Sequence, residues 1–273
     1  MSFYRPIGEE KKENMKVSKQ IIQVKTWSIH YEVIGEGEPL VLVHGLAEST
    51  RVWNRNLSAF AERYRVYLID LPGFGAMRNY HQQLHLTELD VWLDEWMRAI
   101  GLERINLVGH SMGAYVCMAL AAMQPERIKH LVLVDSIGLP FHLPIRCLVY
   151  PALKAIVRTG LSFCWRIGYD YLRAGPKMVL RAARQVVALD ATSVISSVHV
   201  PTLLVWGEND DLIPSSYGRQ LHERLPNAHF LLLSGANHFC MYEQPSVFNQ
   251  VVCAFLQGEE IGRDTVINTS IVS

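Results

Sequence analysis

The sequence predicts an α/β protein built on a mostly parallel sheet, and two patterns carry this prediction. First, six short apolar segments are too continuously hydrophobic for strands with one face in water; they span residues 40–43, 66–69, 105–108, 131–134, 202–206 and 230–233. Second, helical patterns separate many of these segments, and such alternation is typical of parallel sheets. Two earlier strands, residues 20–24 and 28–34, are expected to form an antiparallel edge. We therefore expect eight strands in one sheet.

One helix and one insertion stand out between the predicted strands. Apolar side chains recur at helical spacing from Leu86 to Ile100, and Gly101 follows as a helix-ending residue, so this segment predicts a core helix. Residues 137–198 form an aromatic, basic and Pro-containing helical stretch, which predicts a helical cap inserted after the sixth strand. The expected organisation is an N-terminal extension over 1–18, a core over 19–136 and 199–257, the cap over 137–198, and a flexible polar tail over 258–273.

Composition argues against several classes of function. Lys plus Arg and Asp plus Glu number 26 each, so the balanced charge argues against a nucleic-acid partner. The five cysteines contain no C-x-x-C pair, which argues against zinc or redox chemistry and favours free thiols in a reducing compartment. The N-terminal segment is charged, and no uncharged apolar run of about 18 residues occurs. We therefore expect a cytoplasmic protein with no transmembrane segment and no bound metal.

A motif for a nucleophile lies at the end of the fifth predicted strand. Residues 109–113 read Gly-His-Ser-Met-Gly, and an Ala-, Met- and Leu-rich helical segment follows from Ala114. In a Gly-x-Ser-x-Gly turn the flanking glycines leave room for a serine on strained backbone, with its hydroxyl projecting above the sheet. A strand before the motif and a helix after it are the context that this turn requires. Ser111 is therefore the predicted nucleophile.

A catalytic serine needs a base, and the base needs an orienting acid. Catalytic groups in open α/β sheets gather beyond the carboxyl ends of the strands, so histidines that directly follow strands are favoured. His44 and His238 qualify best among the eleven histidines. His44 lies in a tight turn and is predicted to brace it, whereas His238 follows the last strand through a flexible polar loop. His238 is therefore the predicted base.

The acid is expected between the serine and the histidine in the chain, as in the order Ser, acid, His. The segment Trp-Gly-Glu-Asn-Asp-Asp-Leu-Ile-Pro over 206–214 follows the penultimate strand and lies in this interval. Asp210 is preferred over Asp211, although either carboxylate taken alone also fits a turn residue. Asp135, after the sixth strand, is a rival for the same role, with a structural position at the mouth of the site as the favoured interpretation. Asp70 is predicted to form a turn.

From about Ile21 to Leu256 the sequence resembles the α/β-hydrolase superfamily, and specifically its small carboxylesterases and carrier-protein methyl ester esterases. The motifs that carry the resemblance are Val43-His44-Gly45, Asp70-Leu71-Pro72-Gly73-Phe74-Gly75, Gly109-His110-Ser111-Met112-Gly113, Gly207-Glu208-Asn209-Asp210 ahead of Ile213-Pro214, and His238 with Glu243-Gln244-Pro245. The resemblance implies an α/β-hydrolase fold with Ser111 as nucleophile, Asp210 as acid and His238 as base. It also implies an oxyanion hole formed by the backbone N–H groups of Leu46 and Met112.

The activity implied by the resemblance is hydrolysis of a small carboxylic ester through an acyl-enzyme intermediate, with no cofactor. Serine at position 111 argues against the dehalogenases and epoxide hydrolases, which carry aspartate there. The residues Leu46 and Ala47 disfavour the hormone-sensitive-lipase-like esterases and proline iminopeptidases, which have further glycines at this point. Two alternatives stay open, namely a carbon–carbon bond hydrolase with the same triad and a non-catalytic ligand-binding or accessory protein.

The predicted cap is the one strongly basic part of the chain. Its only acidic residues between 137 and 198 are Asp170 and Asp190, whereas its basic residues are Arg146, Lys154, Arg158, Arg166, Arg173, Lys177, Arg181 and Arg184. A solvated cationic surface is one interpretation, since long basic side chains commonly line exposed helices. The other is recognition of an anionic partner, either an acyl carrier protein or an anionic lipid surface.

Overall fold

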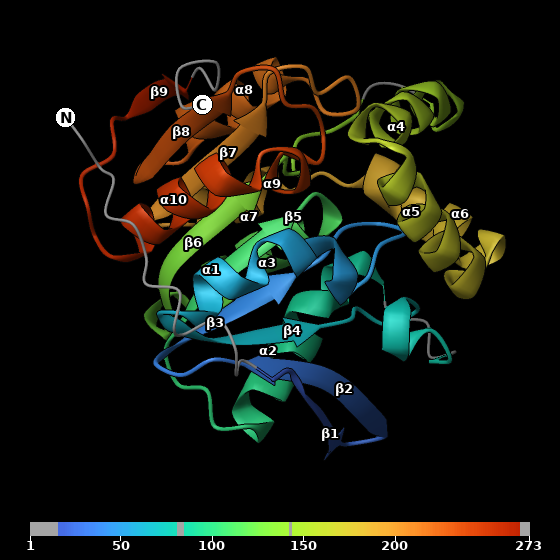
Figure 1. Ribbon diagram of the computed structural model, residues 1–273, viewed down its shortest axis with the longest axis vertical. Helices are drawn as coiled ribbons and strands as arrows, with labels where there is room; N and C mark the ends of the chain where they lie inside the picture. Colours follow the sequence, from blue (N-terminus) through green and yellow to red (C-terminus); the bar gives the residue numbers. More distant parts are fainter. Residues whose placement is uncertain (1–15, 81–84, 142–143, 268–273) are drawn as a thin grey trace.

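A computed structural model describes residues 16–80, 85–141 and 144–267, and a single sheet forms its centre (Figure 1). The strands lie in the order β1-β2-β4-β3-β5-β6-β7-β8-β9, with antiparallel pairing for β1 with β2 and β2 with β4 and parallel pairing elsewhere. They are β1 (Ser18–Val24), β2 (Trp27–Ile34), β3 (Glu38–Val43), β4 (Tyr64–Ile69), β5 (Ile105–His110), β6 (Ile128–Val134), β7 (Thr202–Gly207), β8 (Ala228–Leu233) and β9 (Asp264–Ile267). The predicted α/β-hydrolase fold with an antiparallel edge is confirmed.

Helices cover both faces of the sheet, because successive side chains of each buried strand point to opposite faces. On one face the strands pack against α2 (Leu89–Ala99), α3 (Met112–Met123), α7 (Thr192–Ser196) and α8 (Ser215–Arg224). On the other they pack against α1 (Leu57–Ala61), α9 (Cys240–Glu243) and α10 (Pro245–Leu256). Short 3₁₀ helices occupy Thr50–Arg55, Gly75–Met77, Leu86–Glu88 and Pro125–Arg127. The predicted core helix before Gly101 is α2, preceded by one of these 3₁₀ turns.

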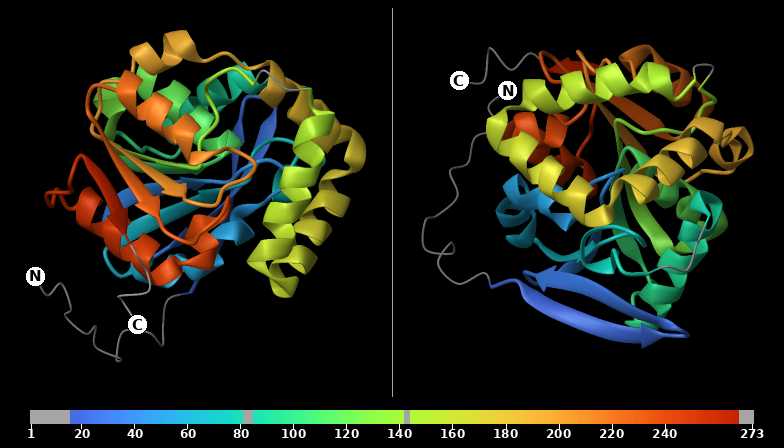
Figure 2. Two further views of the ribbon diagram at one scale, coloured as in Figure 1. Left: turned by 90° about the horizontal axis from the view of Figure 1, so that it is seen from above. Right: turned by 90° about the vertical axis from the view of Figure 1, so that its right-hand side faces the viewer.

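The helical cap enters between β6 and β7, as predicted. It contains α4 (Arg146–Thr159), α5 (Leu161–Ala174) and α6 (Pro176–Ala188), which Figure 2 shows as a layer on one side of the molecule. Gly160 and Gly175 separate these helices with φ angles of 112° and 83°, a backbone region that favours glycine. One buried carboxylate ties the cap to the core, because Asp170 of α5 accepts hydrogen bonds from Ser49 and Arg51.

The number of strands differs from the prediction by one. The sequence predicts eight strands and a loose tail over 258–273, whereas residues 264–267 of that tail form β9 beside β8. The pairing uses a backbone hydrogen bond of 2.9 Å from the Phe230 N–H to the Arg263 carbonyl and an ion pair of 2.6 Å between Arg219 and Asp264. A four-residue edge strand with exposed positions lacks the continuous apolar pattern by which the buried strands are detected. The rest of this tail, 268–273, and residues 1–15 of the predicted N-terminal extension lie outside the described residues.

Candidate active site

Ser111 lies at the sharp turn between β5 and α3, on backbone that side chains rarely adopt. Its φ and ψ are 52° and −115°. The two motif glycines are required by close packing: a Cβ on Gly109 would lie 2.6 Å from the Ala114 Cα, and a Cβ on Gly113 would lie 2.2 Å from the His44 carbonyl oxygen. The structure therefore holds Ser111 in the strained geometry that the motif predicts.

Asp210 and His238 meet through the loops that follow β7 and β8. The His238 Nδ1 and the Asp210 Oδ2 are 2.8 Å apart, and both side chains are buried. The other carboxylate oxygen, Oδ1, accepts hydrogen bonds from the backbone N–H groups of Leu212 and Ile213 at 2.8 and 2.9 Å. Each oxygen of Asp210 thus has a fixed partner, so the carboxylate can hold the imidazole ring in one orientation.

The neighbouring carboxylate, Asp211, points away from the imidazole and toward the cap. It forms ion pairs of 2.8 Å with Lys154 and 2.9 Å with Arg158, both from α4. The side chain of Asp211 is 38% exposed, in contrast to the buried Asp210. The preference for Asp210 that the sequence supports only weakly is therefore matched by the geometry.

Residues near the nucleophile hold the His238 loop in place. The His110 Nε2 donates a hydrogen bond of 2.8 Å to the His238 carbonyl oxygen, and the two imidazole rings lie 4.9 Å apart between centroids. The end of β7 packs tightly on the same segment, because a Cβ on Gly207 would lie 2.1 Å from the Asn237 carbonyl oxygen. The residue before Ser111 thus contacts the predicted base directly, which brings the ends of β5, β7 and β8 together.

A buried acid, Glu48, braces the loop that contains the predicted oxyanion donor Leu46. Its Oε2 accepts a 2.9 Å hydrogen bond from the Gly45 N–H, and its Oε1 lies 3.0 Å from the His110 Nδ1. Burial raises the pKa of Glu48, but the charge and hydrogen bond of His110 outweigh it, so the pKa is lowered overall. Within the described chain, no hydrogen bond uses the N–H of Leu46 or Met112, so both donors are free for a ligand.

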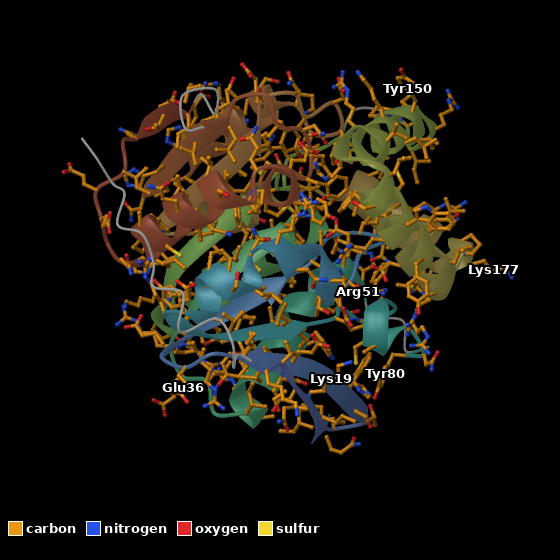
Figure 3. The ribbon with its side chains drawn as sticks, viewed as in Figure 1. Lys19, Glu36, Arg51, Tyr80, Tyr150 and Lys177 are labelled. Atoms are coloured by element: carbon orange, nitrogen blue, oxygen red, sulfur yellow. The ribbon has the colours of Figure 1, made fainter. Side chains whose placement is uncertain are left out.

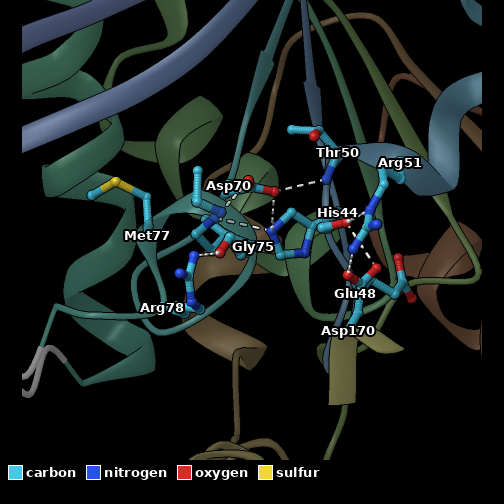
Figure 4. Close-up of polar contacts among 12 residues, drawn as sticks. His44, Glu48, Thr50, Arg51, Asp70, Gly75, Met77, Arg78 and Asp170 are labelled. Atoms are coloured by element: carbon cyan, nitrogen blue, oxygen red, sulfur yellow. Dashed lines mark hydrogen bonds and ion pairs between the residues drawn. The ribbon is translucent and has the colours of Figure 1, made fainter. Parts of the chain in front are cut away.

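His44 and Asp70 take the supporting roles that the sequence predicts, as Figure 4 shows. The His44 Nδ1 donates to the Gly45 carbonyl oxygen at 2.8 Å, and its Nε2 accepts from the Leu71 N–H at 2.9 Å. Asp70 accepts hydrogen bonds of 2.7 Å from the backbone N–H groups of Thr50 and Ala76. With both ring nitrogens engaged by backbone, His44 braces the turn.

Asp135 is buried beneath the predicted triad on strained backbone with a φ of 44°. Its Oδ1 accepts a 2.9 Å hydrogen bond from the Gly207 N–H, which ties β6 to β7. Burial and the charge of Asp210 raise the pKa of Asp135 well above its usual range. Donor atoms of Asp135, His110 and His238 lie within 4.8 Å of one another, but both ring nitrogens of His110 already have oxygen partners. This cluster therefore fits a packed support for His238 better than a set of free metal ligands.

The electrostatics favour a protonated His238. Burial lowers the pKa of its imidazole, but the charge and hydrogen bond of Asp210, together with Asp135 and Glu48, raise the pKa to about 9. An environment of this kind stabilises the imidazolium that forms when a histidine removes a proton from a nucleophile.

Sequence reasoning missed two groups that position the site. The first is the Glu48–His110 pair, because a buried acid three residues after a glycine has no distinguishing pattern along the chain. The second is Glu243, whose carboxylate accepts hydrogen bonds from the Asn237 N–H at 2.8 Å and from the Thr159 hydroxyl at 2.6 Å. Glu243 thus connects the loop of His238 to α4 of the cap. Its only signal was the Glu-Gln-Pro motif at 243–245.

Comparison with known families agrees with this architecture. A family model described as alpha/beta hydrolase fold matches residues 38–155, and a second, described as TAP-like protein, matches residues 181–266. The first match ends within α4 and the second begins within α6, so α5 lies between them, and together they take in most of the described strands. The chain belongs to the α/β-hydrolase superfamily, and its curated relatives include esterases and other hydrolases.

Curated relatives differ in the bonds that their names imply. A pimeloyl-[acyl-carrier protein] methyl ester esterase of Aeromonas hydrophila subsp. hydrophila is 28% identical over 84% of this chain and 99% of its own length. A 2-hydroxy-6-oxononadienedioate/2-hydroxy-6-oxononatrienedioate hydrolase of Pseudomonas putida is 28% identical over 84% of this chain and 91% of its own length. Among solved structures, a thermophilic esterase from Thermogutta terrifontis superposes with a TM-score of 0.74 at 24% identity, covering 88% of this chain and 98% of its own, which shows the shared fold.

Proposed function

We propose that this protein hydrolyses small carboxylic esters through an acyl-enzyme intermediate. The observation that carries the proposal is the 2.8 Å contact between Asp210 and His238, in a chain whose only Gly-x-Ser-x-Gly turn presents Ser111 on strained backbone. A serine, a buried carboxylate and an imidazole, in this order along the chain, form the constellation used for acyl transfer on this fold. The ester esterase among the relatives supports the same chemistry.

The proposed reaction has two halves. In the first, the Ser111 oxygen attacks the ester carbonyl, His238 takes its proton, and the Leu46 and Met112 N–H groups stabilise the negative oxygen. Collapse of this intermediate breaks the ester bond, and the proton passes from His238 to the departing alcohol. In the second half, water attacks the acyl group with His238 again as base, which releases the acid and restores Ser111. Each oxyanion donor is worth about 3 kcal/mol of barrier.

The direct test uses p-nitrophenyl acetate and a fluorophosphonate probe. We expect a burst of p-nitrophenol equal to the enzyme concentration, and covalent labelling on the peptide that contains Ser111. Ser111→Ala should abolish both, because members of such a triad act as a unit. Ser136→Ala is the matched control, since Ser136 is also buried but its hydroxyl donates to the Ile137 carbonyl oxygen. Turnover by Ser111→Ala at the parent rate would refute the assignment.

A carbon–carbon bond hydrolase is the second candidate, and the relative from Pseudomonas putida favours it. The substrate in that relative's name carries no ester, so its hydrolysis must break a carbon–carbon bond. Loss of the absorbance of a 2-hydroxy-6-oxo-dienoate, without hydrolysis of p-nitrophenyl acetate, would identify this activity. Binding of such compounds with no turnover of either would instead indicate an accessory protein.

The cysteines and the relatives bear on the compartment and the partner. The five cysteines are all unpaired, which supports a cytoplasmic location. Among the described helices, none combines the length and the apolar character needed to cross a membrane. The name of the esterase relative suggests an acyl carrier protein as the source of the ester. Faster hydrolysis of a carrier-bound methyl ester than of the free methyl ester would support that partner.

A further inference from the structure

The outer surface of the cap exposes an unusual concentration of large apolar side chains. They are Val149, Tyr150, Leu153 and Val157 of α4, Leu161, Trp165, Tyr169, Tyr171 and Leu172 of α5, and Leu180 of α6, here called the outer cap face. Leu161 and Trp165 are 83% and 82% exposed. Outside the cap, the exposed large apolar residues of the described chain are scattered, at Ile21, Val91, Met123 and Val266. A concentration of exposed large apolar residues on three successive helices marks an interaction site, unlike the singly scattered apolar residues of an ordinary surface.

Helix α5 shows that this exposure is not a side effect of covering the core. Its inner face already buries Phe163 and Ile167, and these positions alternate at helical spacing with the exposed Leu161, Trp165 and Leu172. A helix at the surface of a globular protein normally turns a polar face to solvent. Helix α5 is apolar on both faces: the inner face packs against the core, and the outer face is suited to contact with an apolar environment outside the protein.

Positive charge accompanies the apolar residues. In α4, α5 and α6 the sole acidic residue is Asp170, which is buried and paired with Arg51 of the core. Lys154 and Arg158 share a single carboxylate, that of Asp211. Arg166 and Arg173 donate hydrogen bonds to the Arg51 carbonyl oxygen and the Tyr169 hydroxyl. No ion pair within the described chain includes the other four cap cations, Arg146, Lys177, Arg181 and Arg184. Figure 3 shows Tyr150 and Lys177 at the outer margin of the cap, away from the sheet.

We propose that the outer cap face binds the surface of an anionic phospholipid bilayer, with α4 and α5 lying in the plane of the interface. Large aliphatic side chains, Trp and Tyr at one surface, with unpaired Arg and Lys nearby, are the chemistry of helices that rest on anionic lipid. A second copy of this chain would bring its own cations against these, which disfavours self-association. An acidic protein would pair with the cations, but its charged surface would give Leu161 and Trp165 no apolar environment in which to be buried.

This docking uses none of the residues in the proposed triad, so it can be tested in the inactive Ser111→Ala protein. Trp165 supplies an internal probe, because the five other tryptophans, at 27, 53, 92, 96 and 206, are no more than 6% exposed. Vesicles of phosphatidylcholine with phosphatidylglycerol should shift the emission to the blue and shield it from acrylamide. Brominated lipids in those vesicles should quench it. Trp165→Phe should bind as the parent does but lose these signals.

Vesicle sedimentation with two multiple variants separates the contribution of the apolar residues from that of the positive charges. A triple variant should weaken binding to the vesicles by about tenfold or more, because it removes three large apolar groups from the interface: Leu161→Ser, Trp165→Ser and Leu172→Ser. Lys177→Glu with Arg184→Glu should weaken binding by about tenfold or more, and added salt should do the same to the parent. Ile21→Ser with Val266→Ser is the matched control on exposed apolar residues outside the cap, and it should bind normally.

Four results would overturn the proposal. They are equal binding by all variants, equal binding to pure phosphatidylcholine, a concentration-dependent dimer that the Leu161, Trp165 and Leu172 changes abolish, and capture of an acidic carrier protein without binding to vesicles. Retained vesicle binding in a protein that hydrolyses no ester would leave the proposal standing and refute only the proposed catalysis.

Discussion

The Asp210→Asn substitution tests the site most sharply, because the structure dictates how the new amide must sit. The Oδ1 position of Asp210 accepts two backbone N–H groups, from Leu212 and Ile213, so an amide NH₂ placed there would face two donors. The asparagine oxygen must therefore occupy that position, and its NH₂ must face the His238 Nδ1 at 2.8 Å. The Nδ1 then has to accept, and the ring proton moves to Nε2. In that tautomer His238 cannot take a proton from the nucleophile.

The expected loss is about 10⁴-fold in kcat, the size observed when the acid of a serine triad is changed to its amide. The matched substitution is Asp211→Asn at the next residue. Asp211 is partly exposed and pairs with Lys154 and Arg158, and exposed ion pairs contribute about 0 to 1 kcal/mol. Because Asp211 has no contact with His238 among the described interactions, we expect its kcat to change by less than about threefold.

Steady-state hydrolysis of p-nitrophenyl acetate by both variants measures the two effects, with thermal unfolding as the check on folding. Asp210→Asn should keep a cooperative transition, since asparagine has nearly the same shape and retains the two backbone contacts. A loss of less than tenfold in Asp210→Asn would refute the assignment of this acid. A larger loss in Asp211→Asn would move the role by one residue, and a mild effect in both would point to Asp135.

Two further predictions follow from the same geometry. The pKa of about 9 for His238 predicts that kcat/KM rises with pH up to about 9, above the usual histidine value of about 6.5, because the neutral ring is the base. A kcat/KM that levels off by about pH 7 would contradict the raised pKa. The raised pKa of His238 also stabilises the folded state: this contribution is full below about pH 6.5 and is lost as the pH rises through 9. Gly113→Ala should lower the free energy of unfolding by about 2 kcal/mol or more, since its Cβ would lie 2.2 Å from the His44 carbonyl oxygen. Urea denaturation measures this change in the free energy of unfolding. The control is Gly168→Ala in α5, which should be neutral or stabilising because a Cβ there meets nothing within 4 Å. Equal losses of stability in the two variants would contradict the prediction.

The sequence determined those features that depend on neighbours along the chain. Buried parallel strands are apolar on both faces, so β3 to β8 are recognisable as continuous runs. The turn at Ser111 is equally local, because its glycines are required by the strained backbone and close packing of a strand-to-helix turn. The order of the three predicted catalytic residues follows from the order of the strands that carry them. These signals predicted the fold, the cap and the contact between the loops of Asp210 and His238 at the sheet edge.

Tertiary structure alone decided features that depend on contacts between distant segments. Asp210 and Asp211 are adjacent and chemically identical, and only the packing of α4 shows that one faces His238 while the other pairs with the cap. The Glu48 contact with His110 joins residues 62 positions apart, which no local pattern records. The outer cap face was likewise hidden, because apolar residues at helical spacing predict a helix without saying which side meets the core. Burial is a property of the assembled chain, since it depends on what the remaining elements cover.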